Sequence, residues 1–246
     1  MDAELKIIRA IGRALPPIRG ATAVINRVLK PFYLRRPRPT VIARALGFTL
    51  SLDPAEAIDG ALLFYPHLFN RRELQWLRTH LKPDDVFVDG GAYIGVFSLV
   101  ASDICRKVIA IEANPFVLPR LLANIDVNER AITPINAGLS DRRETLTLHI
   151  QDKGNLGGSS FVAQHGGRTV AVDCHPLHEL APKADILKLD VELMEYRVLA
   201  SYFQRHKPRA IILEVSAGNN DTLDLCQQAG YRIEARTLEN ALLLLG

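Results

Sequence analysis

The chain has 246 residues and a formal net charge of +3, and 48% of its residues are hydrophobic and 23% charged. This composition is typical of a globular protein with one sizeable core and an extension. Cys105, Cys174 and Cys226 are few, scattered and odd in number, which excludes a disulfide framework and a cysteine-rich zinc site and favours a cytoplasmic protein. We find no apolar run of about 18 residues that could span a bilayer, and no signal core before a small-residue cleavage site.

The positive charge is concentrated at the N-terminus. Residues 1–40 carry nine bases against two acids, so this segment has a net charge of +7 and the remainder −4. The bases are Lys6, Arg9, Arg13, Arg19, Arg27, Lys30, Arg35, Arg36 and Arg38.

Residues 6–15 predict an amphipathic helix that Pro16 and Pro17 end. One side of its helical wheel holds Ile7, Ile8, Ile11 and Leu15, and the other holds Lys6, Arg9 and Arg13. Two interpretations stay open: the helix packs on its own domain with a solvated basic face, or it lies on an anionic membrane surface or an acidic partner. We assign residues 1–39 to a basic helical N-terminal extension and residues 40–246 to the main domain.

Beyond Pro39 the pattern is that of a folded domain. Residues 40–46 and 48–53 predict a short hairpin about Gly47, although a glycine in a strand pattern is also consistent with a bulge. Asp53, before Pro54, and Asn70 are each typical of a residue that caps the start of a helix.

From residue 85 short strands alternate regularly with helical stretches, which predicts a doubly wound α/β sheet. The predicted strands are 85–89, 107–112, 131–136, 185–190 and 209–214, and the helices are 94–104, 115–127, 192–206 and 218–229. YRIEAR (231–236) and NALLLL (240–245) then form a hairpin, so the last strand should return antiparallel at the sheet edge. The methyltransferase version of the fold ends in such a hairpin, whereas the nucleotide-binding half of a dehydrogenase does not need one.

The stretch VFVDGGAYIG (86–95) indicates a strand that turns tightly into a helix beneath a ligand. Asp89 ends the strand, where an open parallel sheet binds its ligand. At about 4 Å its carboxylate would repel a pyrophosphate by roughly 4 kcal/mol at an effective dielectric constant of 20, but would attract an ammonium or sulfonium by a similar amount. Ala92 also replaces the second glycine of the dinucleotide fingerprint. The stretch therefore favours S-adenosylmethionine over a dinucleotide, and Gly91 and Gly95 make the turn.

The second strand supports the same choice of cofactor. VIAIEANP (108–115) contains Glu112, 23 residues after Asp89, close to the separation of about 20 that lets an acid reach a ribose in a βαβ unit. Glu112 should accept both ribose hydroxyls, and Asn114 and Pro115 begin the next helix. Either carboxylate alone would fit a solvated strand end, but the pair at this spacing predicts a cofactor site.

Six segments then occur in succession. They are DGGAYIG (89–95), EANP (112–115) with Asn124 downstream, NAGLSD (136–141), GGSSF (157–161), DILKLDVELMEYRVL (185–199) and IILEV (211–215). This succession resembles the FkbM-type S-adenosylmethionine-dependent methyltransferases over residues 45–245. The resemblance implies a class I methyltransferase (Rossmann-like) fold with a seven-stranded sheet, and O-methylation of a hydroxyl on a sugar, glycolipid or polyketide-like small molecule. It places the cofactor on Asp89, Gly91, Ala92, Tyr93, Gly95, Glu112 and Asn114, with Ala137 and Gly138 near the adenine.

The chain departs from the family pattern at two places on the acceptor side. Leu193 stands where the family usually has glycine, and the family's T-L-D signature is matched only loosely by PLH (176–178). Leu193 is expected to narrow the pocket, to select an apolar acceptor, or to remove activity altogether.

Three carboxylates follow the later strands. Asp190 ends the fourth strand, Glu192 follows it and Glu214 ends the fifth, so all three should lie at one edge of the sheet. We expect one of them, Asp190 in preference, to act as general base, for a gain of about 10²- to 10⁴-fold. Asp190 and Glu214 could instead hold a divalent ion, although no metal site is predicted. Glu192 and Glu195 could also merely complement a helix N-terminus.

Other motifs and functions stay open. Cys174, His175 and His178 lack a second cluster that would complete a zinc site, although either histidine could act as a base. The loop at 152–160 is typical of a lid or of a hairpin tip. The basic N-terminus could guide a nucleic-acid methyltransferase, although its stacking aromatics amount to Phe32 and Tyr33. The fold could also be a non-catalytic module that binds a partner through residues 1–40. The sequence names neither the acceptor nor the oligomeric state.

Overall fold

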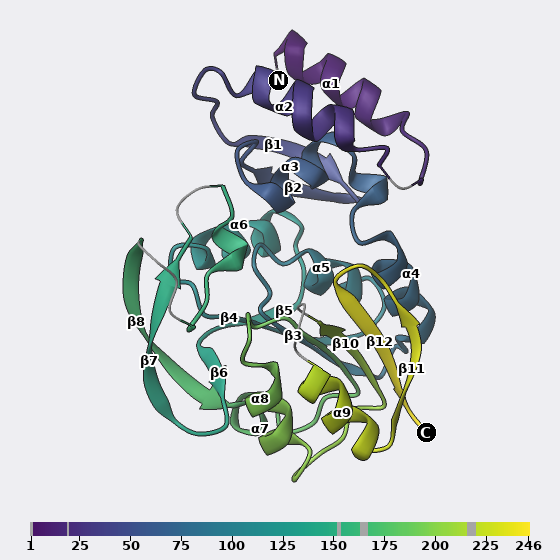
Figure 1. Cartoon of the computed structure of the whole chain (residues 1–246), viewed down its shortest axis with the longest axis vertical. Coiled ribbons are helices and arrows are strands. Elements are labelled where there is room, and N and C mark those ends of the chain that lie inside the picture. Colours follow the sequence, from purple (N-terminus) through teal and green to yellow (C-terminus); the bar gives the residue numbers. More distant parts are fainter. Residues whose placement is uncertain (1, 19, 152–153, 163–166, 216–219) are drawn as a thin grey trace. The chain divides into compact units, whose positions relative to one another are not determined.

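The computed structural model of the chain describes residues 2–18, 20–151, 154–162, 167–215 and 220–246 (Figure 1). The chain divides into two compact units. The first comprises residues 1–71 and 152–157, and the second comprises residues 72–151 and 158–246. The domain boundary after residue 39 stays a prediction.

The first unit combines helices with a two-stranded antiparallel sheet. Its elements are α1 (Ala3–Arg13), η1 (Ile25–Leu29), α2 (Lys30–Tyr33), β1 (Val41–Ala45), β2 (Phe48–Leu52), α3 (Ala57–Phe64) and η2 (Pro66–Leu68). The hairpin predicted about Gly47 is confirmed, because Ala45 pairs with Phe48. Leu46 and Gly47 both have positive φ, 54° and 97°, as a two-residue turn of a twisted hairpin requires.

The predicted cap of the next helix is wrong. The helix α3 begins at Ala57 with Glu56 as its N-cap residue, three residues later than Asp53 and Pro54 suggested. Asp53 instead stabilises the preceding turn, where its carboxylate accepts a hydrogen bond from the Ala55 amide at 2.9 Å.

Helix α1 buries a different face from the one that the helical wheel predicted. Leu5 and Ile8 are buried, but Ile7 and Ile11 are 61% and 41% exposed. Arg9, expected on the solvated basic face, is buried and donates a hydrogen bond to a backbone carbonyl of β1.

Close contact with α3 explains the choice of face. A Cβ atom on Gly12 would lie 2.2 Å from the carbonyl oxygen of Phe64, so the backbones of the two helices are in close contact at this glycine. The face around Gly12 is the one that lets the backbones meet, whereas the isoleucine stripe would hold them apart.

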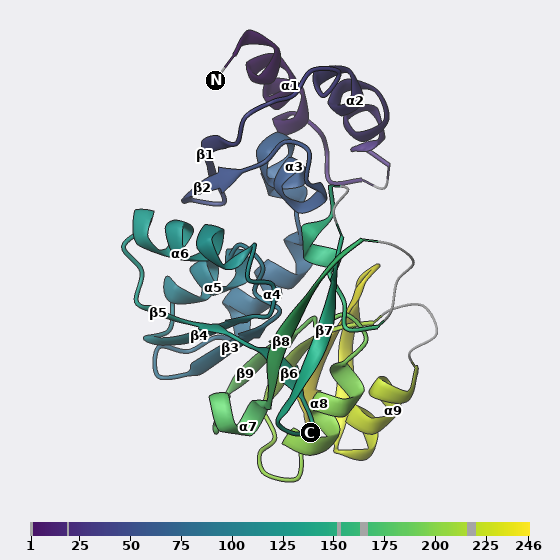
Figure 2. The same cartoon turned by 90° about the vertical axis from the view of Figure 1, so that its left-hand side faces the viewer.

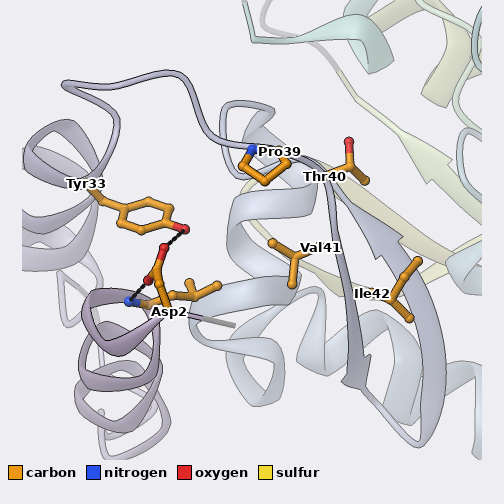
Figure 3. A pocket seen from close by; sticks show the side chains of 7 residues that line it. Asp2, Tyr33, Pro39, Thr40, Val41 and Ile42 are labelled. Carbon is orange, nitrogen blue, oxygen red and sulfur yellow. Dashed lines mark hydrogen bonds between the residues drawn. The ribbon is translucent and has the colours of Figure 1, made fainter.

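A pocket of about 390 Å³ lies between the N-terminus of α1 and strand β1 (Figure 3). Its polar side-chain atoms come from Asp2, Tyr33 and Thr40, and the Tyr33 hydroxyl donates a hydrogen bond to the Asp2 carboxylate at 3.3 Å. The guanidinium of Arg38 lies 4.1 Å from the ring centroid of Tyr33 and pairs with Asp2 at 3.1 Å. The lining residues are Asp2, Leu5, Tyr33, Pro39, Thr40, Val41 and Ile42.

The second unit is built on a seven-stranded sheet of order β11-β12-β10-β9-β3-β4-β5. Its five parallel strands confirm the predicted strands to within one residue at each end. These are β3 (Val86–Gly90), β4 (Lys107–Glu112), β5 (Ile132–Asn136), β9 (Ile186–Leu189) and β10 (Ala210–Glu214).

The C-terminal hairpin is confirmed, but the predicted position of its last strand is wrong. β12 (Asn240–Leu245) is antiparallel to both neighbours and lies between β10 and β11 (Tyr231–Arg236), which forms the edge. Burial explains the order. Residues 241–243 of β12 are almost fully buried, whereas β11 alternates with exposed Arg232, Glu234 and Arg236, as an edge strand with one solvated face does.

Helices cover both faces of the sheet (Figure 2). One face carries α4 (Arg71–His80), α5 (Val96–Ser102) and α6 (Leu118–Val127), and the other carries α8 (Glu195–Tyr202) and α9 (Asn220–Gln228). The four predicted helices are confirmed in shorter form, and residues 218–219 of the last lie outside the described residues. A small sheet of order β6-β8-β7, which the sequence did not predict, joins β6 (Gly138–Ser140), β7 (Glu144–Ile150) and β8 (Arg168–Pro176), and α7 (Leu177–Leu180) follows.

Within the described residues, no helix combines the length and the apolar character that crossing a bilayer demands. Cys105, Cys174 and Cys226 are all buried and free of disulfides.

We predict that Gly12→Ala destabilises the α1–α3 contact. In an ordinary helix interior this change stabilises by about 0.5–1 kcal/mol, but here the added methyl would collide with the carbonyl of Phe64. Hydrogen exchange of the α1 amides should therefore become faster than in the parent chain. Slower exchange would show that the normal helix preference prevails and that the two backbones are not in close contact.

Candidate functional site

The turn between β3 and α5 fits tightly against the end of β9. Gly91 has a φ of 77°, and a Cβ atom there would lie 1.8 Å from the carbonyl oxygen of Asp190. The amides of Gly91 and Ala92 both donate to the carbonyl of Ile111 at 2.9 Å. Only glycine allows this combination of conformation and close approach at residue 91.

Residues of α6 contact the rest of the turn. Gly95 has a φ of 87°, and a Cβ atom there would lie 2.6 Å from a methyl group of Leu121. The fully buried amide of Asn124 donates to the carbonyl of Ile94 at 3.0 Å. Tyr93 has a φ of 50°, which is uncommon for a residue other than glycine and marks a constrained turn.

Asp89 lies beneath this turn rather than free at the crevice mouth. It is fully buried, and one carboxylate oxygen accepts hydrogen bonds from the Ser98 amide at 3.1 Å and the Ser98 hydroxyl at 2.6 Å. Its other oxygen lies 3.5 Å from the ammonium of Lys188. The structure thus gives Asp89 the local task of fixing the first turn of α5 and partnering a buried cation.

Lys188 connects the two strands that carry the site. Its ammonium donates to the carbonyl of Gly91 at 2.7 Å and lies 3.2 Å from Asp190. Burial lowers the pKa of Lys188, but the charges of Asp190 and Asp89 outweigh burial, and the pKa is raised above its usual value. Lys188 was not among the predicted site residues. The signal was present, because a lysine inside an otherwise apolar strand needs a partner of opposite charge.

Glu112 lies at the end of β4, where the sequence placed it. One carboxylate oxygen accepts from the Tyr93 amide and the other from the Asn114 amide, each at 2.7 Å. Burial raises the pKa of Glu112 in spite of these two hydrogen bonds. Each oxygen keeps further acceptor capacity, so the carboxylate can still bind two hydroxyl groups.

The GGSSF segment links the two sides of the site. Ser159 accepts a hydrogen bond from the buried side chain of Asn114 at 3.2 Å. The hydroxyl of the next residue, Ser160, donates to the carbonyl of Glu192 at 2.9 Å. Asp152 and Lys153 of the predicted loop lie outside the described residues.

Ala137 and Gly138, expected near the adenine, follow β5 directly. Both are buried, and the Ala137 amide donates to the carbonyl of Glu112 at 3.2 Å. A Cβ atom on Gly138 would lie 2.4 Å from the sulfur of Cys174 and 2.8 Å from the ring of Phe161. The glycine therefore lets β8 and the GGSSF segment pack beside this strand end.

Asp190, Glu192 and Glu214 come together at the carboxyl end of the sheet. Asp190 and Glu192 follow β9, and Glu214 ends β10. Carboxylate oxygens of the three residues all lie within 4.8 Å of one another. Burial, and then repulsion from Asp190 and Glu195, raises the pKa of Glu192 to about 7. Burial and a carboxyl–carboxylate hydrogen bond to Asp190 raise the pKa of Glu214 to about 9. The cluster therefore holds at least one proton at neutral pH.

The backbone at Glu192 and Leu193 is left-handed, with φ values of 52° and 77°. A glycine would adopt this conformation freely, whereas other residues carry a cost of about 1–3 kcal/mol. This explains why glycine suits position 193. Leu193 is 46% exposed, so it is only partly covered by the rest of the protein.

Glu195 has a role different from that of its neighbours. It is fully buried in the first turn of α8 and accepts a hydrogen bond from the Val191 amide at 2.8 Å. This contact closes the turn before the helix, which supports the helix-terminus interpretation for Glu195.

Within the part of the chain that the structure describes, Cys174, His175 and His178 make no hydrogen bond or ion pair with Asp190, Glu192 or Glu214. Burial raises the pKa of Cys174 to about 11, so its sulfur is a thiol at neutral pH. His175 lies 3.8 Å from Glu179, which also pairs with Arg143.

We predict that Lys188→Met destabilises the second unit by about 3–5 kcal/mol, because Asp89 becomes a buried charge without a cation. Adding Asp89→Asn should restore part of the loss. Urea unfolding followed by the fluorescence of Trp76, the sole tryptophan, measures both effects. The exposed Lys183→Met is the matched control and should change little. Equal stability of Lys188→Met and the control would contradict the role of the ion pair.

Solved structures of similar shape share little sequence with this chain. aTrm5 in complex with tRNALeu is 18% identical, with a TM-score of 0.51 over 85% of this chain and 53% of that chain. TYW2 of M. jannaschii in complex with AdoMet is 17% identical, with a TM-score of 0.49 over 86% and 89%. Precorrin-6y C5,15-methyltransferase of Geobacter metallireducens GS-15 is also 17% identical, with a TM-score of 0.48 over 73% and 87%. Likeness at this level concerns the fold alone.

The sequence itself matches a family model. No curated protein matches the chain. The methyltransferase FkbM domain, in contrast, matches residues 89–233, which is more than half of the chain and includes the carboxyl ends of the five parallel strands β3, β4, β5, β9 and β10. The expected resemblance and the class I methyltransferase fold are thereby confirmed. The chain belongs to the FkbM methyltransferase domain family.

Proposed function

We propose that the protein is an S-adenosylmethionine-dependent O-methyltransferase that acts on a hydroxyl of a sugar, glycolipid or polyketide-like small molecule. The observation that carries the proposal is the cluster of Asp190, Glu192 and Glu214, which stands at the strand ends beside the glycine turn. Membership of a methyltransferase family supplies the cofactor class.

The residues around the turn fit this cofactor. Glu112 retains acceptor capacity on both oxygens for the two ribose hydroxyls. Gly91 and Gly95 adopt the left-handed conformations that the turn needs in order to pack against Asp190 and Leu121. Lys188 neutralises part of the charge of Asp89. The attraction for an ammonium or sulfonium therefore comes mainly from the other carboxylates of the site, those of Asp190, Glu192 and Glu214. When bound, S-adenosylmethionine supplies the methyl group.

The cluster can remove the proton of an acceptor hydroxyl. Asp190 was the preferred base, but its carboxylate already pairs with Lys188 at 3.2 Å and shares a hydrogen bond with Glu214. Glu192, whose pKa is about 7, is better matched to proton transfer at neutral pH. We propose that Glu192 accepts the proton of the acceptor hydroxyl and that Asp190 aligns this hydroxyl.

The same three carboxylates could hold a divalent ion instead. The ammonium of Lys188, 3.2 Å from Asp190, would repel such an ion and already supplies positive charge. We therefore propose proton transfer without a metal, and treatment with EDTA should leave turnover unchanged.

Nucleic acid is the alternative acceptor class, because aTrm5 was solved with tRNALeu. Two observations disfavour it for this chain. Tyr33, one of the two aromatics considered for base stacking, is buried and packs edge-on against Phe64. The carboxylate cluster would also repel a phosphate backbone.

We predict that Asp190→Asn abolishes methyl transfer and leaves the affinity for S-adenosylmethionine nearly unchanged, because the cofactor contacts that we propose lie on Glu112 and the turn. Calorimetry measures the affinity. Tritium transfer from labelled S-adenosylmethionine to a glycan and small-molecule extract measures the activity, with Asp173→Asn, an exposed carboxylate of β8, as the control. Unchanged transfer would remove the assignment of Asp190, and no binding by the parent chain would identify a non-catalytic module.

We predict that kcat/KM rises with pH and levels off above about pH 7. Burial raises the pKa of Glu192 to about 7, so its carboxylate, the form that accepts a proton, predominates only above that pH. Glu192→Gln should lower the plateau by about 10²- to 10⁴-fold and remove this limb of the pH profile. A variant profile that keeps the same limb would show that another group titrates.

A further inference from the structure

Apolar side chains are exposed on two helical segments of the first unit, namely α1 and the segment formed by residues 24–33, which contains η1 and α2. Ile7 and Ile11, four residues apart, are exposed on α1. Val24, Val28 and Phe32, also at intervals of four, are 57%, 58% and 52% exposed along η1 and α2. Residues four apart lie on one side of a helix, so each segment carries an apolar stripe. The two segments lie side by side within this unit (Figures 1 and 2).

Neither stripe is needed for packing. α1 is already anchored through Leu5, Ile8 and Gly12, and the second segment is anchored through Ile25 and Tyr33, which are fully buried. Among the described residues, six of the fourteen exposed large apolar side chains lie between residues 7 and 32. Single exposed apolar residues are ordinary, but such a concentration marks a binding surface.

The stripes lie among exposed basic side chains. Arg38 binds both acids of the segment, Asp2 at 3.1 Å and Glu4 at a shorter distance. The guanidinium of Arg35 lies 4.8 Å from the ring centroid of Phe32, so charge and apolar surface adjoin. The exposed bases of the two segments are Lys6, Arg13, Arg27, Arg35 and Arg36.

We propose that the two apolar stripes bind the surface of an anionic phospholipid membrane. A membrane surface offers both matching chemistries, with anionic headgroups for the bases and an acyl boundary for the aliphatic and aromatic side chains. RNA would match the charge but leave the aliphatic side chains exposed. A second copy of this face would bring two strongly basic surfaces together. The surface belongs to the first unit and does not rest on the proposed function.

Vesicle flotation of the full chain tests this proposal. The chain should float with phosphatidylcholine vesicles that contain phosphatidylglycerol and stay unbound with phosphatidylcholine alone. Val28→Ser/Phe32→Ser should lower the partition coefficient tenfold or more. Arg27→Gln/Arg36→Gln should lower it about fivefold for each base, from the contribution of a base near an anionic surface. Every substituted side chain is exposed, so folding should be preserved, which circular dichroism checks.

Matched controls carry the same changes elsewhere. Leu122→Ser/Val127→Ser alters two exposed apolar residues of α6, and Arg106→Gln/Lys107→Gln alters two exposed bases, and both should float like the parent chain. Failure of the parent chain to bind anionic vesicles overturns the proposal. Unchanged binding by Val28→Ser/Phe32→Ser also overturns it, because adsorption would then be purely electrostatic. Self-association in light scattering that this variant abolishes would assign the stripes to a second copy instead.

Discussion

A buried ammonium between two carboxylates holds the site together. Lys188 on β9 lies between Asp89 at the end of β3 and Asp190 just beyond β9, and it also binds the carbonyl of Gly91. Removal of the ammonium, or of the carboxylates, would leave the opposite charge buried without a partner, which is strongly unfavourable. The same contact presses the glycine turn onto β9, where no side chain at residue 91 could fit.

The carboxylates beyond this ion pair have different environments and therefore different protonation. Asp190 is held by Lys188, whereas burial and mutual repulsion raise the pKa of Glu192 and Glu214. Three carboxyl groups that arise from one sheet edge can thus take separate tasks. The left-handed backbone at Glu192 and Leu193 adds strain at the same place, and the hydroxyl of Ser160 helps to fix it.

The N-terminal segment serves a different physical purpose from the sheet. Its helices bury small and mixed faces against their own unit and leave aliphatic stripes beside uncompensated bases. The two interpretations of the amphipathic helix, packing on its own domain and binding a membrane or partner, are therefore compatible. One face of α1 packs on its own unit, and we propose that another binds a membrane. The chemistry proposed for the second unit does not require this surface, so the two proposals can fail independently.

Local patterns were sufficient for the positions of the parallel strands, the glycine turn, and the acids at the ends of β3, β4, β9 and β10, because periodicity and turn chemistry act over a few residues. Tertiary structure alone decided which face of α1 is buried, that β12 lies inside the sheet, and that Lys188 meets Gly91 across 97 residues of chain. It also decided the pKa of Glu192. Burial and charge pairing depend on residues that are distant in sequence, and no local pattern records which of them become neighbours.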